Sequence, residues 1–349
     1  MENTTNTSND ISHQTEFRPR VLSQKPTLTG REALVVESAY HGFYDANKGR
    51  ERIVLHNIDL IVEPGTFLSL VGPSGCGKST LLKIITGQET VQKAVQFDVL
   101  GKTVGLPDRR RGVVFQAYSL APHLTVLGNI LLGLEFQAGF FERFSPSWRK
   151  RAKEIAMAYL ETMRLADAAD KYPSELSGGM RQRAAIAQSL ITIDMFGMPD
   201  ILCMDEPYGA LDPSTREDLQ VFILKLWEKY KKTIIFVTHD LEEALFLGTR
   251  LVVLSQFWTS DLPPELQEGA RIVLDQPLDN RAMSTDIKKT AEFGERIQYI
   301  RDVGFNPKQR RHVAEFNSQL THPSSFQTLS TEECHIGGGF SERELLDKD

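Results

Sequence analysis

The sequence has few cysteines and no long apolar run. Its cysteines, Cys76, Cys203 and Cys334, are odd in number and have no CxxC spacing, which excludes a disulfide framework and gives no zinc site. The most apolar stretch, residues 130–141, is interrupted by Glu135 and falls short of the roughly 18 apolar residues that a membrane span needs. The N-terminus lacks the basic and then apolar pattern of a signal peptide. We expect a protein of a reducing cytosol that, if it serves a membrane, works from the water side.

The chain also has no excess of positive charge. Its 40 Lys and Arg against 46 Asp and Glu give a formal net charge of -6, whereas nucleic-acid binders usually carry a basic stripe. Nucleic acid is therefore not an expected partner. The 349 residues, 41% hydrophobic and 25% charged, are typical of a globular chain with one large core, alone or with a smaller appendage.

Composition divides the chain into three parts. Residues 1–32 are rich in Asn, Thr, Ser and Gln and predict a disordered polar lead. Apolar strand-like runs alternate with helical patterns over residues 33–256, with a helical block at about 126–190. Beyond residue 256 this alternation fades, so residues 257–349 are expected to form a C-terminal extension that is partly disordered.

The alternation in the middle part predicts an α/β fold with a mostly parallel sheet covered by helices. Residues 33–36 and 58–62 are expected to form antiparallel edge strands, and a helix is expected to begin near Lys78. The expected strands of the parallel sheet are residues 66–71, 112–115, 201–204, 233–238 and 250–254.

The stretch GPSGCGKST, residues 72–80, matches G-x-x-x-x-G-K-[ST] between an expected strand and an expected helix. Its small residues let backbone N–H groups surround phosphate oxygens at a helix N-terminus. A chance Gly-rich turn is the alternative, but the flanking strand and helix favour a P-loop NTPase core. We expect Lys78 to reach the outer phosphates and Ser79 to ligate Mg²⁺. The expected nucleotide-binding residues are Gly72, Pro73, Ser74, Gly75, Cys76, Gly77, Lys78, Ser79 and Thr80.

A second motif, ILCMDEP, is an apolar run that ends in two carboxylates. Asp205 at the end of a buried strand is expected to make a second-sphere contact to Mg²⁺, and Glu206 beyond it can polarise the water that attacks the γ-phosphate. The alternative is an exposed acidic pair that only closes a strand.

Between these motifs lies LSGGMRQR, and the three together resemble ATP-binding cassette (ABC) proteins over residues 34–256. Ser177, Gly178 and Gly179 precede a predicted helix, so unpaired backbone N–H groups at its N-terminus can again bind an anion. One cassette cannot use two phosphate cradles for one nucleotide. The resemblance implies a head-to-tail pair of cassettes, the same chain twice or two related subunits, with two ATP molecules between them.

The resemblance implies roles for further residues. Gln116, in VVFQ, resembles the glutamine that contacts Mg²⁺ and links the nucleotide to the helical block. His239, in FVTHD, resembles the histidine that contacts the γ-phosphate, and Asp212, in GALD, resembles the aspartate that signals across the dimer.

An aromatic residue that stacks on adenine is also implied. Tyr40, in VESAY, falls where the family stacks this ring on adenine and is the expected residue. Phe43 and Tyr44 lie close by, and either could pack in the core.

The resemblance further implies a membrane permease as partner, a solute-binding protein as an indirect partner, and a peripheral place on the cytoplasmic face of the inner membrane. Residues 115–124 and the helical block are where the family receives the permease. Tyr118, Leu120 and Leu124 could equally be core residues of that block.

The phrases SGGMRQRAAIAQSL, DEPYGALDPSTR and VTHDLEEALFL are similar to bacterial importer cassettes for nitrate, sulfonate and taurine. The longer link at residues 191–199, the sequence Gly248-Thr249-Arg250 and the longer tail depart from that pattern. The cargo stays open, and urea or guanidine would fit the same nucleotide residues.

Two other classes of ABC protein are alternatives. A soluble ATPase of translation or DNA repair usually has two cassettes or a long coiled coil, and this chain has one cassette and no heptad run. An exporter half would carry membrane spans. An importer subunit is the preferred hypothesis.

Overall fold

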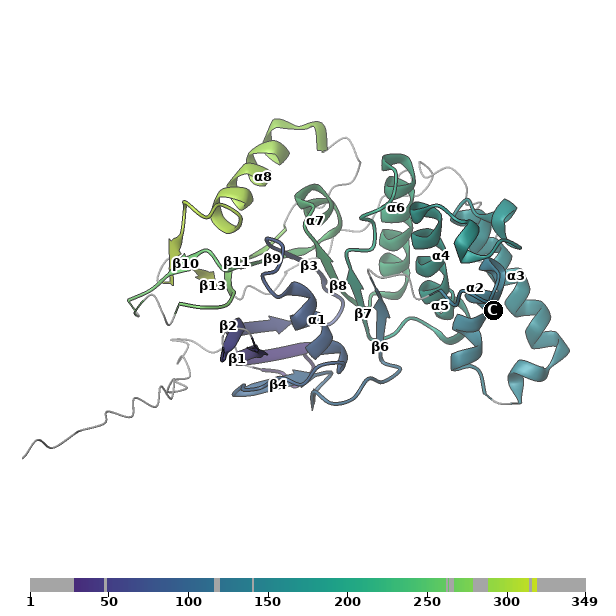
Figure 1. Cartoon of the computed structure of the whole chain (residues 1–349), viewed down its shortest axis with the longest axis horizontal. Helices are drawn as coiled ribbons and strands as arrows, with labels where there is room; N and C mark the ends of the chain where they lie inside the picture. The colour runs from purple at the N-terminus through teal and green to yellow at the C-terminus, as the bar shows by residue number, and fades with distance from the viewer. Residues whose placement is uncertain are drawn as a thin grey trace, which may run out of the picture.

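The computed structural model describes residues 28–46, 49–115, 120–139, 141–261, 263, 267–278, 288–313 and 316–318. Two sheets lie beside each other, a block of helices stands at one end, and α8 lies at the other (Figure 1). Within the described residues, no helix combines the length and apolar character needed to cross a membrane.

The main sheet has the strand order β13-β11-β9-β3-β8-β7-β6 in the described part of the chain. Neighbours from β9 to β6 are parallel, β11 is antiparallel to β9, and β13 is parallel to β11. All six residues of β8 are buried, as expected for a strand covered on both faces. The prediction of a mostly parallel sheet is confirmed. Its strands are β3 (Phe67–Val71), β6 (Arg111–Val114), β7 (Ile201–Asp205), β8 (Thr233–Thr238), β9 (Arg250–Ser255), β11 (Arg271–Pro277) and β13 (Asn317–Ser318).

The second sheet is antiparallel, in the order β2-β1-β4-β5. Its strands are β1 (Leu34–Asp45), β2 (Arg50–Val62), β4 (Gln96–Val99) and β5 (Lys102–Thr103). The expected edge strands at 33–36 and 58–62 are only the ends of the much longer β1 and β2. Register shifts between Val36 and Gly42 break the alternation of apolar and polar residues, which is why the sequence pattern missed the rest.

Helices cover both sheets and build the helical block. Their bounds are α1 (Lys78–Thr86), α2 (Val126–Gln137), α3 (Pro146–Thr162), α4 (Gly178–Leu190), α5 (Thr192–Phe196), α6 (Pro213–Tyr230), α7 (Leu241–Leu247) and α8 (Ala291–Gly304). Short 3₁₀ helices occupy Glu142–Phe144, Ala166–Ala168 and Pro173–Glu175. One core joins the block to the main sheet, with Ile130 of α2 and Phe236 of β8 both fully buried. A second core holds α1 between the two sheets, around Leu81 and Leu68.

Residues after 256 add a strand to the main sheet and a helix that packs on it. β11 pairs with β9, and α8 covers this end of the main sheet in a third core that contains Val253, Leu274, Phe293 and Ile300. The two short strands β10 (Trp258–Thr259) and β12 (Arg311–His312) pair with each other. The fading sequence rhythm did not predict β11 or α8. The polar lead up to residue 27 and the tail from residue 319 lie outside the described residues.

Candidate active site

The loop at residues 72–77 runs from the end of β3 to the start of α1, and its glycines are required by close packing. A Cβ on Gly72 would lie 2.0 Å from the Leu254 oxygen. Gly77 has a left-handed backbone, with φ 96, and its Cβ would come within 2.8 Å of side-chain carbons of Val54 and Leu55. The loop therefore presents bare N–H groups at a helix N-terminus, which fits a phosphate.

Lys78 folds back over this loop. Its side chain is buried, and Nζ donates hydrogen bonds to the carbonyl oxygens of Gly72 at 2.8 Å and Pro73 at 3.1 Å. These bonds hold the ammonium group against the loop, so a phosphate bound by the loop would meet a positioned positive charge.

Ser79 and Asp205 join the P-loop helix to the end of β7. Ser79 Oγ donates a hydrogen bond of 3.1 Å to Asp205 Oδ1. Burial is the main cause that raises the pKa of Asp205; the Ser79 hydrogen bond opposes it, and the charge of Glu206 adds to it. A hydroxyl and a carboxylate are the oxygen donors that Mg²⁺ prefers, and a bound cation would offset the burial of this carboxylate.

The described residues contain no group of three or more His, Cys, Asp and Glu side chains that could hold a metal ion. A cation at Ser79 and Asp205 would therefore complete its shell with phosphate oxygens and water, as Mg²⁺ commonly does. Gln116, the other expected Mg²⁺ contact, lies outside the described residues.

Glu206 and His239 meet at the ends of two adjacent parallel strands, β7 and β8. Nδ1 of His239 lies 3.3 Å from Oε1 of Glu206. Glu206 has a left-handed backbone, with φ 44, and its N–H donates to the Val237 oxygen at 2.9 Å. Such a conformation costs a non-glycine residue about 1–2 kcal/mol.

The second cradle lies at the N-terminus of α4, in the helical block, whereas the P-loop leads into α1 (Figure 1). Ser177 caps α4 and its Oγ accepts a hydrogen bond of 3.3 Å from the Met180 N–H. A Cβ on Gly179 would lie 3.0 Å from the Ala210 oxygen, so the loop packs closely on the segment after Glu206.

Asp212 is exposed and caps α6. Its Oδ1 accepts a hydrogen bond of 3.0 Å from the Thr215 N–H, and this bond is the main cause that lowers the pKa of Asp212. The residue thus has a local structural role in addition to the expected one across a dimer.

Tyr40 is half-buried and its ring is already packed. The Tyr40 and His56 ring centroids are 5.1 Å apart, and His56 in turn lies 5.0 Å from Trp258 of the C-terminal extension. Phe43 is 46% exposed. It stands directly opposite Arg52 in the β1–β2 pair, so these two side chains share a face of the hairpin.

Sequence reasoning missed one residue that organises the site. Gln182 of α4 is buried; its Nε2 donates to the Pro207 oxygen and its Oε1 accepts a hydrogen bond of 2.8 Å from the Ala210 N–H. The side chain ties the helix of the second cradle to the loop that follows Glu206. The position of Gln182 inside LSGGMRQR could have drawn attention to it, but only the fold shows that it bonds to Pro207 and Ala210.

The chain was compared with known proteins. Residues 55–209 match the family model described as ABC transporter. The chain is 42% identical over 207 residues to the aliphatic sulfonates import ATP-binding protein SsuB of Bacillus subtilis, covering 59% of this chain and 74% of that protein. It is 39% identical over 274 residues to the taurine import ATP-binding protein TauB of Pseudomonas aeruginosa, covering 76% of this chain and 94% of that protein. Among solved structures it is similar to a dimeric ATP-binding cassette in a post-hydrolysis state bound to ADP and Pi, with a TM-score of 0.58 and 28% identity over 70% of this chain and 98% of that chain.

Proposed function

The chain belongs to the ABC transporter family, and we propose that it is the ATP-hydrolysing nucleotide-binding subunit of an importer. The observation that carries this proposal is the convergence of charged groups at one edge of the main sheet. Lys78 lies over the P-loop, Ser79 is bonded to Asp205, and Glu206 lies beside His239. The ends of β3, β7 and β8 supply these groups, as expected for a ligand site at the carboxyl ends of parallel strands.

The side chains divide the work of phosphoryl transfer. The α1 N-terminus and Lys78 hold the phosphates and balance their charge. Bound Mg²⁺, for which Ser79 and Asp205 would be ligands together with Gln116, supplies further positive charge to the phosphate oxygens. Glu206 accepts a proton from the attacking water, and His239 holds that carboxylate and contacts the γ-phosphate.

We propose that two cassettes pair head to tail. The chain carries two phosphate cradles, at the N-termini of α1 and α4, and a similar solved cassette is dimeric with ADP and Pi. In this pairing Ser177, Gly178 and Gly179 close over the nucleotide of the partner cassette, and Asp212 contacts the partner.

The relatives named for sulfonate and taurine import support a permease as the second partner. We place the cassette at the cytoplasmic face of the membrane as a peripheral subunit, with a solute-binding protein acting through the permease. The contact surface is proposed at residues 115–124 and the helical block. Leu120 packs partly buried against the core of that block, so it contributes to the fold as well. The cargo is proposed to be a small solute of the sulfonate, taurine and nitrate class.

ATP hydrolysis by the purified chain tests this function. Wild type should release phosphate from ATP with Mg²⁺, and Lys78→Ala should lose nucleotide affinity and activity. Lys83→Ala is the matched control, because Lys83 is an exposed lysine of the same helix. An inactive wild type, or a Lys78→Ala variant as active as wild type, would contradict the proposal. Copurification from detergent with a membrane permease tests the importer role.

A further inference from the structure

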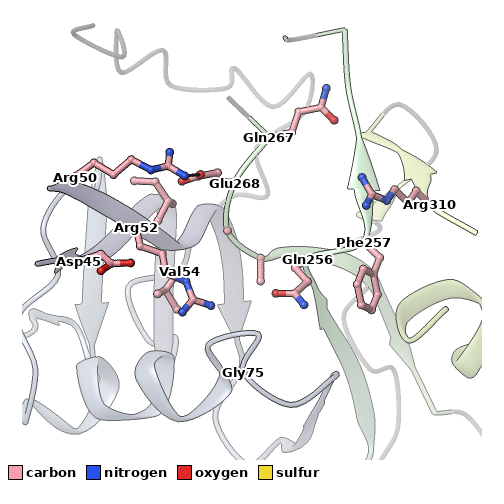
Figure 2. Close-up of a pocket in the computed structure, with 13 residues that line it drawn as sticks. Asp45, Arg50, Arg52, Val54, Gly75, Gln256, Phe257, Gln267, Glu268 and Arg310 are labelled. Atoms are coloured by element: carbon pink, nitrogen blue, oxygen red, sulfur yellow. Dashed lines mark ion pairs between the residues drawn. The ribbon is translucent and has the colours of Figure 1, made fainter. Parts of the chain in front are cut away.

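A pocket of about 320 Å³ opens directly beside the P-loop, at Gly75. One wall is the β1–β2 hairpin, through Arg52 and Val54 among others. The other wall is the connection between β9 and β11, through Gln256 and its neighbours, together with Arg310 beyond α8. Figure 2 shows Gln256 between the hairpin residues and Arg310, with Gly75 below. Two parts of the chain far apart in sequence thus enclose one space next to the phosphate cradle.

The wall from the extension is fixed to the hairpin. The His56 N–H donates to the Ala270 oxygen at 2.9 Å, and the Ala270 N–H donates to the Val54 oxygen at 2.8 Å. Trp258 Nε1 donates to the Gly269 oxygen at 2.9 Å. The Val54 side chain packs so closely on Gly77 that a Cβ there would lie 2.8 Å from it. The wall, the hairpin and the P-loop are therefore connected by direct contacts.

An ion pair adds to this attachment, and a cation–ring contact holds the extension itself together. Arg50 on the hairpin lies 2.7 Å from Glu268 on the connection. The Arg271 guanidinium stands 5.0 Å from the centre of the Trp258 ring. Residues 268–270 are therefore held against the hairpin and Trp258 is bonded to them, so this part of the chain can present side chains in constant positions to a ligand.

Three polar side chains that line the pocket are available for a ligand. Within the described residues, the side chains of Arg52, Gln256 and Arg310 make no hydrogen bond or ion pair. A nucleotide whose phosphates lie in the P-loop must place its base and ribose in a space that adjoins the loop. This pocket adjoins it at Gly75, and its volume suits part of a small ligand.

We propose that residues 256–257 and 267–270, together with Arg310, form the base-side wall of the nucleotide pocket, with Gln256 and Arg310 as contacts to the base and ribose. The inference rests on the proposed ATP binding. A glutamine amide can donate and accept at once along the edge of adenine, and a guanidinium can stack on a base or bond to ribose hydroxyls. The C-terminal extension thereby contributes to nucleotide affinity and to the choice of base.

The test compares ATP with inorganic tripolyphosphate, which has no base or ribose, on the full chain. Gln256→Ala and Arg310→Ala should each weaken ATP binding by about 5- to 30-fold and leave tripolyphosphate binding unchanged. Gln256→Ala should also reduce the preference for ATP over GTP. Lys308→Ala is the matched control, since Lys308 is exposed on the same segment and does not line the pocket.

The outcomes separate this inference from the proposed function. If wild type binds ATP and Lys78→Ala does not, ATP binding stands. The inference is then overturned if Gln256→Ala and Arg310→Ala bind ATP as tightly as Lys308→Ala, or if they lose tripolyphosphate to the same extent as ATP. If wild type fails to bind ATP, the proposed function fails first.

Discussion

His239 Nδ1 lies 3.3 Å from Glu206 Oε1, so the proposed catalytic base has a fixed neighbour at the end of the next strand. Glu206 directly follows β7 and His239 directly follows β8, and the parallel pairing of these strands brings the two side chains together. A base held in this way can be tested by removing only its charge.

Glu206→Gln should lower turnover by about 10²- to 10⁴-fold, because the amide cannot accept the proton of water. Nucleotide binding should persist, since Lys78 and Ser79 are unchanged. With ATP and Mg²⁺ the variant should therefore accumulate as a dimer in sizing chromatography at high protein concentration. Lys78→Ala should stay monomeric under the same conditions. Near-normal hydrolysis by Glu206→Gln would show that Glu206 is not the base.

Phe43→Ala should weaken ATP binding by about 1–3 kcal/mol, as expected for loss of an aromatic face stacked on a base. Phe43 is exposed and shares its hairpin face with Arg52, which lines the pocket at the P-loop. Tyr40→Ala serves as the comparison, and it should act mainly on stability because Tyr40 is the less exposed of the two; each ring contacts a histidine, His56 for Tyr40 and His41 for Phe43. Titration calorimetry of both variants with ATP decides between the two rings; a larger loss in Tyr40→Ala would assign the platform to Tyr40.

Asp205→Asn should stop hydrolysis but raise the free energy of unfolding of the nucleotide-free chain at neutral pH. Burial holds the pKa of Asp205 above its usual value, so the folded chain binds this proton more tightly than the unfolded chain. The stability contributed by Asp205 is complete below the ordinary pKa of 3.8 and is lost as pH rises through the folded pKa. Asparagine does not ionise and so loses no stability as the pH rises. Its side-chain oxygen can still accept the hydrogen bond from Ser79 Oγ.

Urea unfolding of wild type and Asp205→Asn checks this at pH 7 and near pH 4, about the ordinary aspartate pKa. The free energy of unfolding of the variant should exceed that of wild type, and the difference should be larger at pH 7 than near pH 4. A difference that is the same at both values would mean that ionisation of Asp205 is not its cause.

A chain that ends at Leu320 should hydrolyse ATP at the wild-type rate, because the polar composition of the remaining tail predicts no packed core. A chain that ends at Ser255 should fail to fold. It lacks β11 and α8, including Leu274, Phe293 and Ile300, and each such buried side chain contributes about 1.5–3 kcal/mol. Solubility, circular dichroism and phosphate release test both chains. Loss of activity in a folded chain ending at Leu320 would give the tail a role in hydrolysis.

The sequence alone determined the parts of the site that are local in the chain. Thr233–Thr238 is the predicted strand residue for residue, and α1 begins at Lys78 as predicted. A strand, a loop of glycines and a helix follow one another without a break at residues 67–86, so their geometry depends on neighbouring residues. Burial of continuous apolar runs such as β8 likewise needs no distant information.

The tertiary structure decided what meets across the chain. Helix packing brings the Gln182 side chain to Pro207 and Ala210, with which it forms hydrogen bonds. Strand register brings the ring of Tyr40 against the ring of His56. β11 was missed since its partner, β9, lies before a long connection that hides the pairing from any local pattern. Gln256 directly follows β9, and the parallel pairing of β9 with β3 brings it beside the P-loop.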